Sequence, residues 1–409
     1  MHVFSSTLKT LLKATGLVIV FSLNSVAVYG ANTCTSFYVR STEKRSERVM
    51  ISDKVTTEIM RNLSLAKSEI LIEMSNVAGH GVEDILIQKK KDGVAVKVIL
   101  DNRHALKGGD RQKEFERSVS NLRSHGIEVF VSENKHLSMF RNYPKSFLHR
   151  KIMIVDRRYT YVGSANLGIN KNFEIGLFSE HTNVDELTAL FNSDVENIKS
   201  KWTKAYLDVD KLDAKNGTIL LGPGTKNPDT RSEILQVISS AQRRILLSSY
   251  EASDAKVLQK LIEKKKTNPN LEVKVILCSS KANIWLGRRL LKVTKSAVFK
   301  NKLLNSGIEV RELDIPEQYN HSRFIVSDDQ TIGMSSDFTQ RSFDGNIDLG
   351  FHSRETELVQ SAVDGFNNLW NIGSSASKAT LTEYYYDKLI QLNEKVLSNW
   401  MRLKSKLPN

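Results

Sequence analysis

The sequence predicts an α/β protein built from two similar halves that are related by a pseudo-twofold axis. With 409 residues, 40% of them hydrophobic, the chain is long enough to bury two cores. Segments of the first half recur in the same order about 175 to 181 residues later. The matching pairs are 66–76 with 241–251, 86–101 with 261–278, and 124–131 with 305–312. Because helical and strand patterns alternate, we expect layered sheets with largely parallel strands.

Each half has the same order of predicted elements. A helix with apolar residues at helical spacing leads into a strand, and a lysine-rich helix leads into the strand "VKVIL" (residues 96–100 and 273–277). A further helix precedes the short strand "GIEV", and a last strand carries a polar motif. The triple-lysine runs stand at helix ends, which favours a solvated face over a nucleic-acid site.

Composition shifts divide the chain into segments. The stretch 213–230 is rich in Gly, Pro, Asn and Asp, as is typical of a connector. After Trp370 a small-residue linker leads to a helix with apolar residues near one face. The predicted segments are lobe 1 at 48–208, a linker at 209–230, lobe 2 at 231–372 and a C-terminal helix at 373–409.

The N-terminal region has the pattern of a targeting segment. Lys9 and Lys13 precede an apolar run at 17–29, and the small residues Gly30 and Ala31 follow it. This order is typical of a secretory signal peptide, which we place at residues 1–30. The prediction is a protein that is secreted or lies in the cell envelope, with a membrane anchor as the alternative if the segment is not cleaved.

The charge balance permits polyanionic partners. The formal net charge of +13 favours a phospholipid headgroup surface or nucleic acid, and it does not choose between them. The only two cysteines, Cys34 and Cys278, are far apart and lack metal-ligand spacing. They do not by themselves imply a disulfide.

A polar motif flanks the apolar strand at residues 152–155. His149 and Lys151 stand two residues apart just before it, so their side chains share one face. Asp156 follows the strand, and "GSAN" at 163–166 comes next. A titratable imidazole beside a fixed cation suits an anion such as phosphate.

The motif recurs with changes in the second half. His321 and Arg323 repeat the first pair, Asp328 repeats the aspartate, and "MSSD" at 334–337 replaces "GSAN". Downstream, the related segments 172–178 and 346–352 contribute a carboxylate each. These carboxylates are Glu174 and Asp348.

Two opposed imidazoles suit a double displacement at phosphorus. One attacks to form a phosphohistidine, and the other protonates the leaving oxygen and then deprotonates the incoming water or alcohol. The cations stabilise the phosphoryl charge, so the chemistry requires no metal and no cofactor. A carboxylate behind each histidine, Glu174 or Asp348, would fix its tautomer.

These motifs resemble those of the phospholipase D superfamily, whose hallmark is a duplicated H-x-K-x(4)-D-x(6)-G-S-x-N. The first copy matches at every defined position, and the resemblance runs from about residue 49 to 370. It implies two α-β-α sandwich lobes around one site, and a phosphodiesterase or phosphatidyl transferase that works through phosphohistidine. By this resemblance His149 is the nucleophile and His321 the acid. The other implied catalytic residues are Lys151, Asp156, Arg323 and Asp328, and the implied substrate contacts are Ser164, Asn166, Ser336 and Asp337.

The second copy departs from the hallmark at three positions. Arg323 replaces lysine, and Asp337 replaces asparagine with a carboxylate that would repel phosphate. Met334 replaces a glycine, and we expect it to resist a positive φ angle. An impaired protein that only binds anions is therefore the alternative to an enzyme.

The substrate follows less directly from the sequence. A phospholipid is the leading prediction, with a secreted nuclease of the same superfamily as the alternative. The basic, aromatic segments 138–147 and 282–300 would suit either a lipid surface or single-stranded nucleic acid.

Overall fold

The computed structural model describes two lobes of mixed sheet and flanking helices, as the sequence predicts. The described residues are 46–75, 81–107, 109–132, 137–138, 141–144, 148–167, 171–200, 211–213, 218–221, 229–279, 296–315 and 318–377. The N-terminal targeting pattern, Cys34 and most of the segments 138–147 and 282–300 lie outside these ranges or have no described side chains.

Lobe 1 contains a seven-stranded sheet in the order β1-β9-β8-β7-β2-β3-β4. Its central strand β7 carries the first motif and pairs with β2 and β8. A separate two-stranded ribbon pairs β5 with β6. The strands are β1 (Ser46–Ser52), β2 (Glu69–Met74), β3 (Ala95–Asp101), β4 (Glu128–Ser132), β5 (Leu137–Ser138), β6 (Arg141–Pro144), β7 (Ile152–Val155), β8 (Tyr159–Gly163) and β9 (Glu174–Glu180).

Lobe 2 repeats this arrangement in a nine-stranded sheet, β10-β11-β17-β16-β15-β12-β13-β14-β18. From β11 to β14 its order matches that of lobe 1 strand by strand, with β15 in the place of β7. The strands are β10 (Lys211–Asp213), β11 (Thr218–Leu221), β12 (Arg244–Ser249), β13 (Glu272–Cys278), β14 (Glu309–Leu313), β15 (Phe324–Ser327), β16 (Gln330–Met334), β17 (Gly350–Ser353) and β18 (Ser374–Ser375).

The sheets are mixed rather than largely parallel. Strands joined through helices pair in parallel, as in β2–β3, β3–β4, β12–β13 and β13–β14. The motif strands instead continue through tight turns, so β7–β8 and β15–β16 are antiparallel hairpins. Positive φ angles at Asp156 (53°), Arg157 (49°) and Asp328 (50°) form these turns. The alternation of helices and strands did not reveal the hairpins, because each connection is too short to hold a helix.

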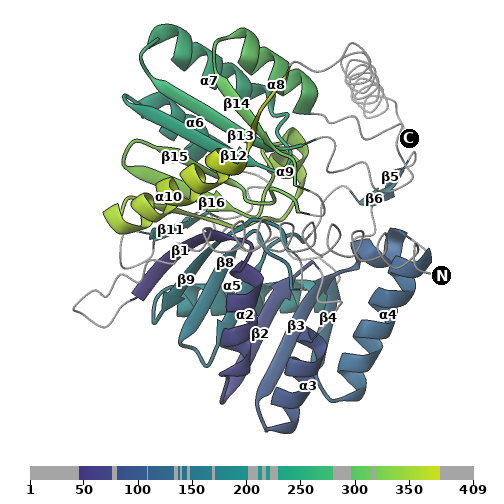
Figure 1. Ribbon diagram of the computed structural model, residues 1–409. Helices are drawn as coiled ribbons and strands as arrows, with labels where there is room; N and C mark the ends of the chain where they lie inside the picture. Colours follow the sequence, from purple (N-terminus) through teal and green to yellow (C-terminus); the bar gives the residue numbers. More distant parts are fainter. Residues whose placement is uncertain are drawn as a thin grey trace, which may run out of the picture. The chain divides into compact units, whose positions relative to one another are not determined.

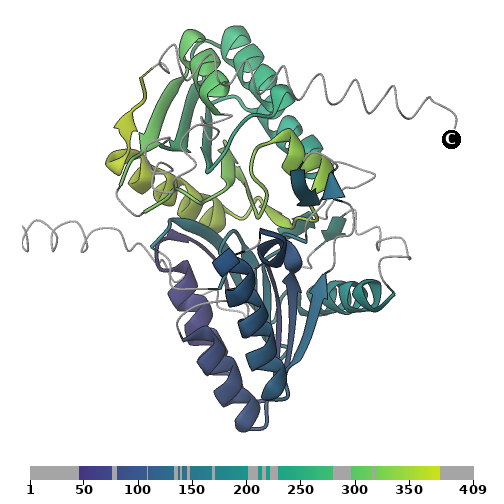
Figure 2. The same cartoon turned by 90° about the vertical axis from the view of Figure 1, so that its right-hand side faces the viewer.

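Helices cover both sheets (Figure 1). In lobe 1, α2 (Val55–Ser64), α3 (Val82–Lys91) and α4 (Gly109–Ser124) pack their apolar residues on one face, after the 3₁₀ helix η1 (Asn102–Lys107). In lobe 2, α6 (Asp229–Ser240), α7 (Ala255–Thr267), α8 (Ser296–Asn305) and the short α9 (Gln340–Gly345) form the equivalent layer. Figure 2 shows these outer layers from a second side.

A third core is shared by the two lobes. The inner faces of both sheets meet α5 (Val184–Lys199) and α10 (Thr356–Ile372) in one cluster of buried side chains. Ile154 and Phe191 come from lobe 1, and Val326 and Phe366 from lobe 2. Burial of these faces against each other holds the two motif strands at a common seam.

Two predicted segments differ from simple connectors. The stretch 209–230 contains β10 and β11, and β11 joins the lobe 2 sheet by pairing with β17. Past α10, β18 pairs with the edge strand β14. The predicted C-terminal helix lies mostly outside the described residues, which end at 377.

Candidate active site

Two isolated backbone bridges join the lobes beside the motifs. Leu148 pairs with Ile347, and Phe173 pairs with Asn320, each in parallel. The N–H group of His149 donates to the carbonyl oxygen of Ile347 at 2.8 Å. In the reverse direction between the lobes, the N–H group of His321 in lobe 2 donates to the carbonyl oxygen of Phe173 in lobe 1 at 2.9 Å. These contacts hold the chain at His149 against the residues before Asp348. They likewise hold the chain at His321 against the residue before Glu174.

Each histidine pairs with a carboxylate of the opposite lobe. Nδ1 of His149 lies 2.8 Å from Oδ1 of Asp348, and Nδ1 of His321 lies 2.8 Å from both carboxylate oxygens of Glu174. In a neutral imidazole, Nδ1–H then donates to the carboxylate and Nε2 keeps its lone pair. The sequence offered Glu174 and Asp348 as such partners, but the crossing between lobes is a feature of the fold.

A buried serine holds each carboxylate in turn. Ser164 Oγ donates to Glu174 at 2.6 Å and accepts from the N–H group of Ile175 at 2.9 Å. Ser335 Oγ donates to Asp348 at 2.6 Å. Ser164 therefore lies behind a histidine partner, where its hydroxyl orients the carboxylate.

In lobe 2 the serine that contacts the carboxylate is Ser335, the neighbour of the predicted Ser336. Ser336 stands at the position of Ala165, whereas Ser335 is the true equivalent of Ser164 and shares its role. Aligning "GSAN" with "MSSD" residue by residue would have found it. We expected Ser336 to contact the substrate, yet the paired serine is the one before it.

The site keeps both imidazoles neutral near pH 7. Burial, reinforced by the charge of Lys151, lowers the pKa of His149 to about 3 despite its carboxylate partner. Burial and the charge of Arg323 also lower the pKa of His321. Burial lowers the pKa of Lys151 well below its usual value, and an anion bound beside it would raise that pKa again.

The two motif cations adopt different contacts. Lys151 Nζ donates to the carbonyl oxygen of its own His149 at 2.6 Å. Arg323 donates from Nη1 to the carbonyl oxygen of His321 at 3.1 Å and from Nη2 to its Nε2 at 2.7 Å. Its Nε also donates to Oδ1 of Asp337 at 2.6 Å. Burial would lower the pKa of Arg323, but the nearby carboxylates of Asp337, Glu174 and Asp348 together raise that pKa.

Asn166 lies at the equivalent position of lobe 1, partly exposed, and its Oδ1 accepts from Ser75 at 2.7 Å. Because the amide oxygen of Asn166 is the acceptor in this contact, its NH₂ group is the part that can donate to a ligand. This suits the phosphate contact predicted from the resemblance.

The motif aspartates lie away from the histidines. Asp156 follows the far end of β7, roughly 13 Å along a four-residue strand. Its carboxylate accepts from the backbone N–H groups of Lys67, Ser68 and Glu69 at 2.7–3.0 Å. Asp328 makes the equivalent contacts in lobe 2. The structure does not support a catalytic role for Asp156 or Asp328, because both carboxylates are engaged in holding the backbone.

Gly163 is required for close packing rather than for its φ angle. It has no positive φ, but a Cβ atom there would lie 2.2 Å from the carbonyl oxygen of Ile175. Met334 occupies the equivalent place in lobe 2 and is fully buried in the outer core. The expected conflict between Met334 and a positive φ is therefore wrong, since neither lobe uses that conformation here.

Asp101 and Arg103 add a feature of lobe 1 that the motif does not contain. Buried Asp101, at the end of β3, accepts from the N–H groups of Leu148 at 2.9 Å and Arg103 at 2.8 Å. The charge of Arg103 lowers the pKa of both His149 and Lys151, so it is near the same site. The only sequence signal was that "VKVIL" ends in aspartate here and in cysteine in lobe 2.

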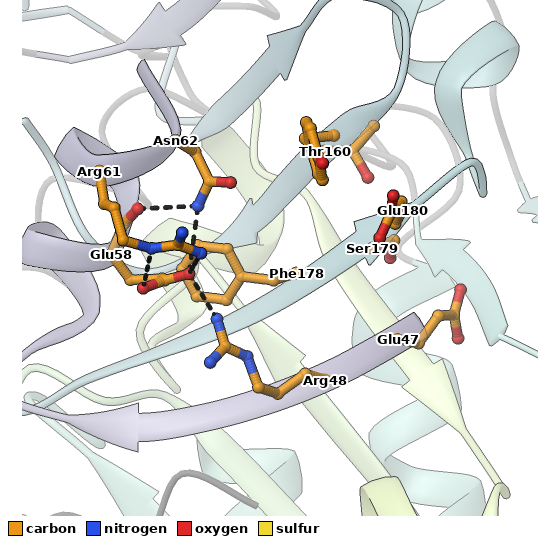
Figure 3. A pocket seen from close by; sticks show the side chains of 10 residues that line it. Glu47, Arg48, Glu58, Arg61, Asn62, Thr160, Phe178, Ser179 and Glu180 are labelled. Carbon is orange, nitrogen blue, oxygen red and sulfur yellow. Dashed lines mark hydrogen bonds and ion pairs between the residues drawn. The ribbon is translucent and has the colours of Figure 1, made fainter. Parts of the chain in front are cut away.

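A surface pocket of about 90 Å³ lies elsewhere in lobe 1 (Figure 3). Its lining residues come from β1, α2, β8 and β9 and include none of the motif residues. Glu58 stands between Arg48 and Arg61 there, and both ion pairs are 2.7 Å long. Its charged groups thus neutralise one another. Within the described ranges, no cluster of three or more potential metal ligands occurs.

Comparison with known proteins identifies the family. A family model described as the PLD-like domain of cardiolipin synthase matches residues 59–195 and 234–370. The chain therefore belongs to the phospholipase D superfamily.

Two bacterial relatives illustrate the similarity. The cardiolipin synthase of Alkalihalophilus pseudofirmus is 24% identical over 380 residues, which cover 86% of this chain and 72% of the relative. The major cardiolipin synthase of Bacillus subtilis is 24% identical over 329 residues, which cover 75% of this chain and 65% of the relative. In fold, the chain resembles a phosphatidylserine synthase of Haemophilus influenzae, with a TM-score of 0.67, 14% identity and coverage of 90% and 96%.

The prediction of secretion through a signal peptide is wrong. The bacterial cardiolipin synthases that the chain matches are membrane-associated and are not secreted through a signal peptide. In the part of the chain that the structure describes, no helix has both the length and the apolar character of a membrane span. Nucleic acid as a partner also finds no support in these relatives.

Proposed function

We propose that the protein is a phosphatidyl transferase that moves the phosphatidyl group of a phospholipid to an alcohol through a phosphohistidine. The observation that carries this proposal is the crossed pair of neutral imidazoles, each held at Nδ1 by the other lobe's carboxylate. The names of the relatives favour transfer over hydrolysis.

The two histidines differ in a way that suggests their roles. Among the described residues, Nε2 of His149 has no hydrogen-bond partner, whereas Nε2 of His321 accepts from Arg323 at 2.7 Å. The lone pair of His149 is thus available to attack phosphorus. Negative charge on a bound phosphodiester would raise the pKa of His321, so that this ring protonates the leaving alcohol oxygen.

Charge stabilisation would come from the motif cations. We expect Lys151, Arg323 and Arg103 to stabilise the charge that the phosphoryl oxygens gain, with Asn166 as a neutral donor. Asp348 and Glu174 would support the imidazolium that forms on each ring. In this scheme the nucleophile, the acid and the compensating charge all come from side chains.

The test uses the full-length protein with EDTA and vesicles of phosphatidylglycerol or phosphatidylcholine, and products are separated by mass spectrometry. Cardiolipin formed from phosphatidylglycerol would support transfer, and phosphatidic acid alone would indicate hydrolysis. We expect His149→Ala to reduce turnover by roughly 1,000-fold or more, because no other group can form the covalent intermediate.

The matched control is His125→Ala, which removes an exposed histidine at the end of α4 and should leave turnover unchanged. Full activity in His149→Ala would contradict the assigned nucleophile. Lipid binding without turnover would instead favour the anion-binding alternative, and cleavage of single-stranded DNA would favour a nuclease.

A further inference from the structure

The two polar departures of lobe 2 from the hallmark motif contact each other. Nε of Arg323 donates to Oδ1 of Asp337 at 2.6 Å. In lobe 1 the equivalent residues do not pair, since Lys151 donates to the carbonyl oxygen of His149 and Asn166 accepts from Ser75. A lone carboxylate at this place would repel phosphate, but the guanidinium compensates its charge. The two substitutions therefore form one ion pair, which is neutral where the hallmark pair of lysine and asparagine carries one positive charge.

The pair has a fixed place beside the acid histidine. The Arg323 side chain is only 2% exposed, and its Nη2 lies 2.7 Å from Nε2 of His321. Any alcohol oxygen that exchanges a proton with Nε2 must approach the same edge of the ring. An alcohol at Nε2 of His321 would therefore lie beside Arg323, which contacts Asp337.

The carboxylate of Asp337 can accept a further hydrogen bond beside His321. Its side chain is 18% exposed, and no described residue donates a hydrogen bond to its Oδ2. A carboxylate only accepts hydrogen bonds, so a ligand there must bring a donor. A hydroxyl group fits this requirement, and a phosphate oxygen does not. The ring of Tyr250, with its centroid 5.4 Å from that of His321, adds an apolar wall for a carbon skeleton.

We propose that Asp337, held by Arg323, binds a second hydroxyl of the alcohol that enters or leaves beside His321, so that the site favours polyols such as glycerol. The inference rests on the proposed transferase function. In the transfer step, the bond between phosphorus and Nε2 of His149 breaks and a bond from phosphorus to one alcohol oxygen forms. The proton of that oxygen passes to Nε2 of His321, which releases its hydrogen bond from Arg323 to accept it. The hydroxyl on Asp337 keeps its proton.

The experiment offers the full-length protein phosphatidylcholine vesicles with glycerol or 1-propanol at equal concentration. The readout is the ratio of phosphatidylglycerol to phosphatidylpropanol formed. We expect the unmodified protein to favour glycerol by roughly ten-fold or more, the value of one hydrogen bond to a charged acceptor. Asp337→Ala should bring the ratio close to one, whatever its effect on the total rate.

Two further variants test the pair and the readout. Arg323→Lys with Asp337→Asn restores the hallmark residues and raises the net charge by one, and it should also lower the ratio, because the amide is a weaker acceptor than the carboxylate. Exposed Asp329→Ala is the matched control and should keep the full ratio. If Asp337→Ala transfers the phosphatidyl group to neither alcohol, the product ratio of the double variant tests the inference instead.

The results separate failure of the polyol inference from failure of the transferase proposal. A ratio near one in the unmodified protein, or an unchanged ratio in Asp337→Ala or the double variant, would overturn the polyol inference and leave the transferase proposal standing. Transfer to neither alcohol, with no cleavage of the lipid, would overturn both.

Discussion

The carboxylate of Asp156 accepts hydrogen bonds from three successive backbone N–H groups at the start of β2, and Asp328 does the same at the start of β12. Both aspartates occupy fixed positions of a motif known for its chemistry. Their contacts show that one residue of each copy maintains the strand arrangement, and only its neighbours reach the reacting groups.

Removing this carboxylate should weaken the fold and spare the reaction. We expect Asp156→Ala to lower the free energy of unfolding by about 1–3 kcal/mol, since three N–H groups lose a charged acceptor. Urea unfolding measures the loss, and exposed Asp92→Ala is the control. The turnover per folded molecule, measured in the cold, should change little. A large loss of kcat in fully folded Asp156→Ala would show that the aspartate does serve the chemistry.

The site residues differ in how well sequence could foresee them. His149, Lys151 and Asn166 stand at fixed spacing, so their grouping was predictable from the motif. Arg103 and the pairing of Arg323 with Asp337 were not, because these contacts depend on where a strand ends and how two side chains turn. Spacing indicates which residues share a face, but it does not determine which other side chain each of them contacts.

At the scale of elements, a buried ion cluster ties β7 to its neighbours in lobe 1. Arg150, between the two motif residues, points to the opposite side and donates through Nη1 to Asp194 of α5. The same Nη1 lies 3.8 Å from Glu73 of β2. All three side chains are almost fully buried. In lobe 2 the equivalent contact is neutral, a 2.8 Å hydrogen bond between Ser248 and Ser322.

Two carboxylates share one guanidinium in this cluster, which favours protonation of one of them. Burial, with the charge of Asp194 adding to it, raises the pKa of Glu73 well above its usual value of 4.5. Above pH 4.5 the unfolded chain releases this proton while the folded chain holds it. Stability therefore falls as pH rises from 4.5 towards the folded pKa.

Glu73→Gln should remove this pH dependence. The variant should gain stability relative to the unmodified protein between pH 5 and pH 8, by at most about 1.4 kcal/mol per pH unit. Urea unfolding at both pH values measures the difference, with exposed Glu128→Gln as the control. An equal difference at the two pH values would mean that Glu73 is charged in the folded protein.

The elements themselves were largely foreseeable. Apolar runs such as "VKVIL" and the repeated helices predicted the parallel part of each sheet and its duplication. The antiparallel half escaped notice, as did the strands within the stretch rich in Gly and Pro. Short hairpins and edge strands are stabilised by pairing with a distant partner, which local composition does not record.

At the scale of the whole molecule, the crossed pairs make each half depend on the other. The carboxylate of Asp348 in lobe 2 orients the predicted nucleophile of lobe 1. We expect Asp348→Asn to lower kcat by roughly 100-fold or more with a smaller change in KM, because the amide no longer supports the imidazolium.

Steady-state kinetics on lipid vesicles measure this split, and Asp185→Asn, exposed at the start of α5, is the control. Loss of Asp348 also removes the group that opposes the low pKa of His149. An unchanged kcat in Asp348→Asn would mean that the contact across the lobes serves only assembly.

The twin bridges at Leu148–Ile347 and Phe173–Asn320 carry an evolutionary consequence. A duplicated gene commonly lets one copy decay while the other keeps the ancestral task. Here each lobe supplies the carboxylate that contacts the other lobe's histidine, so we expect a change at either carboxylate to affect the shared site. Lobe 2 departs from the hallmark at Arg323 and Asp337 and still supplies Asp348 to His149 of lobe 1.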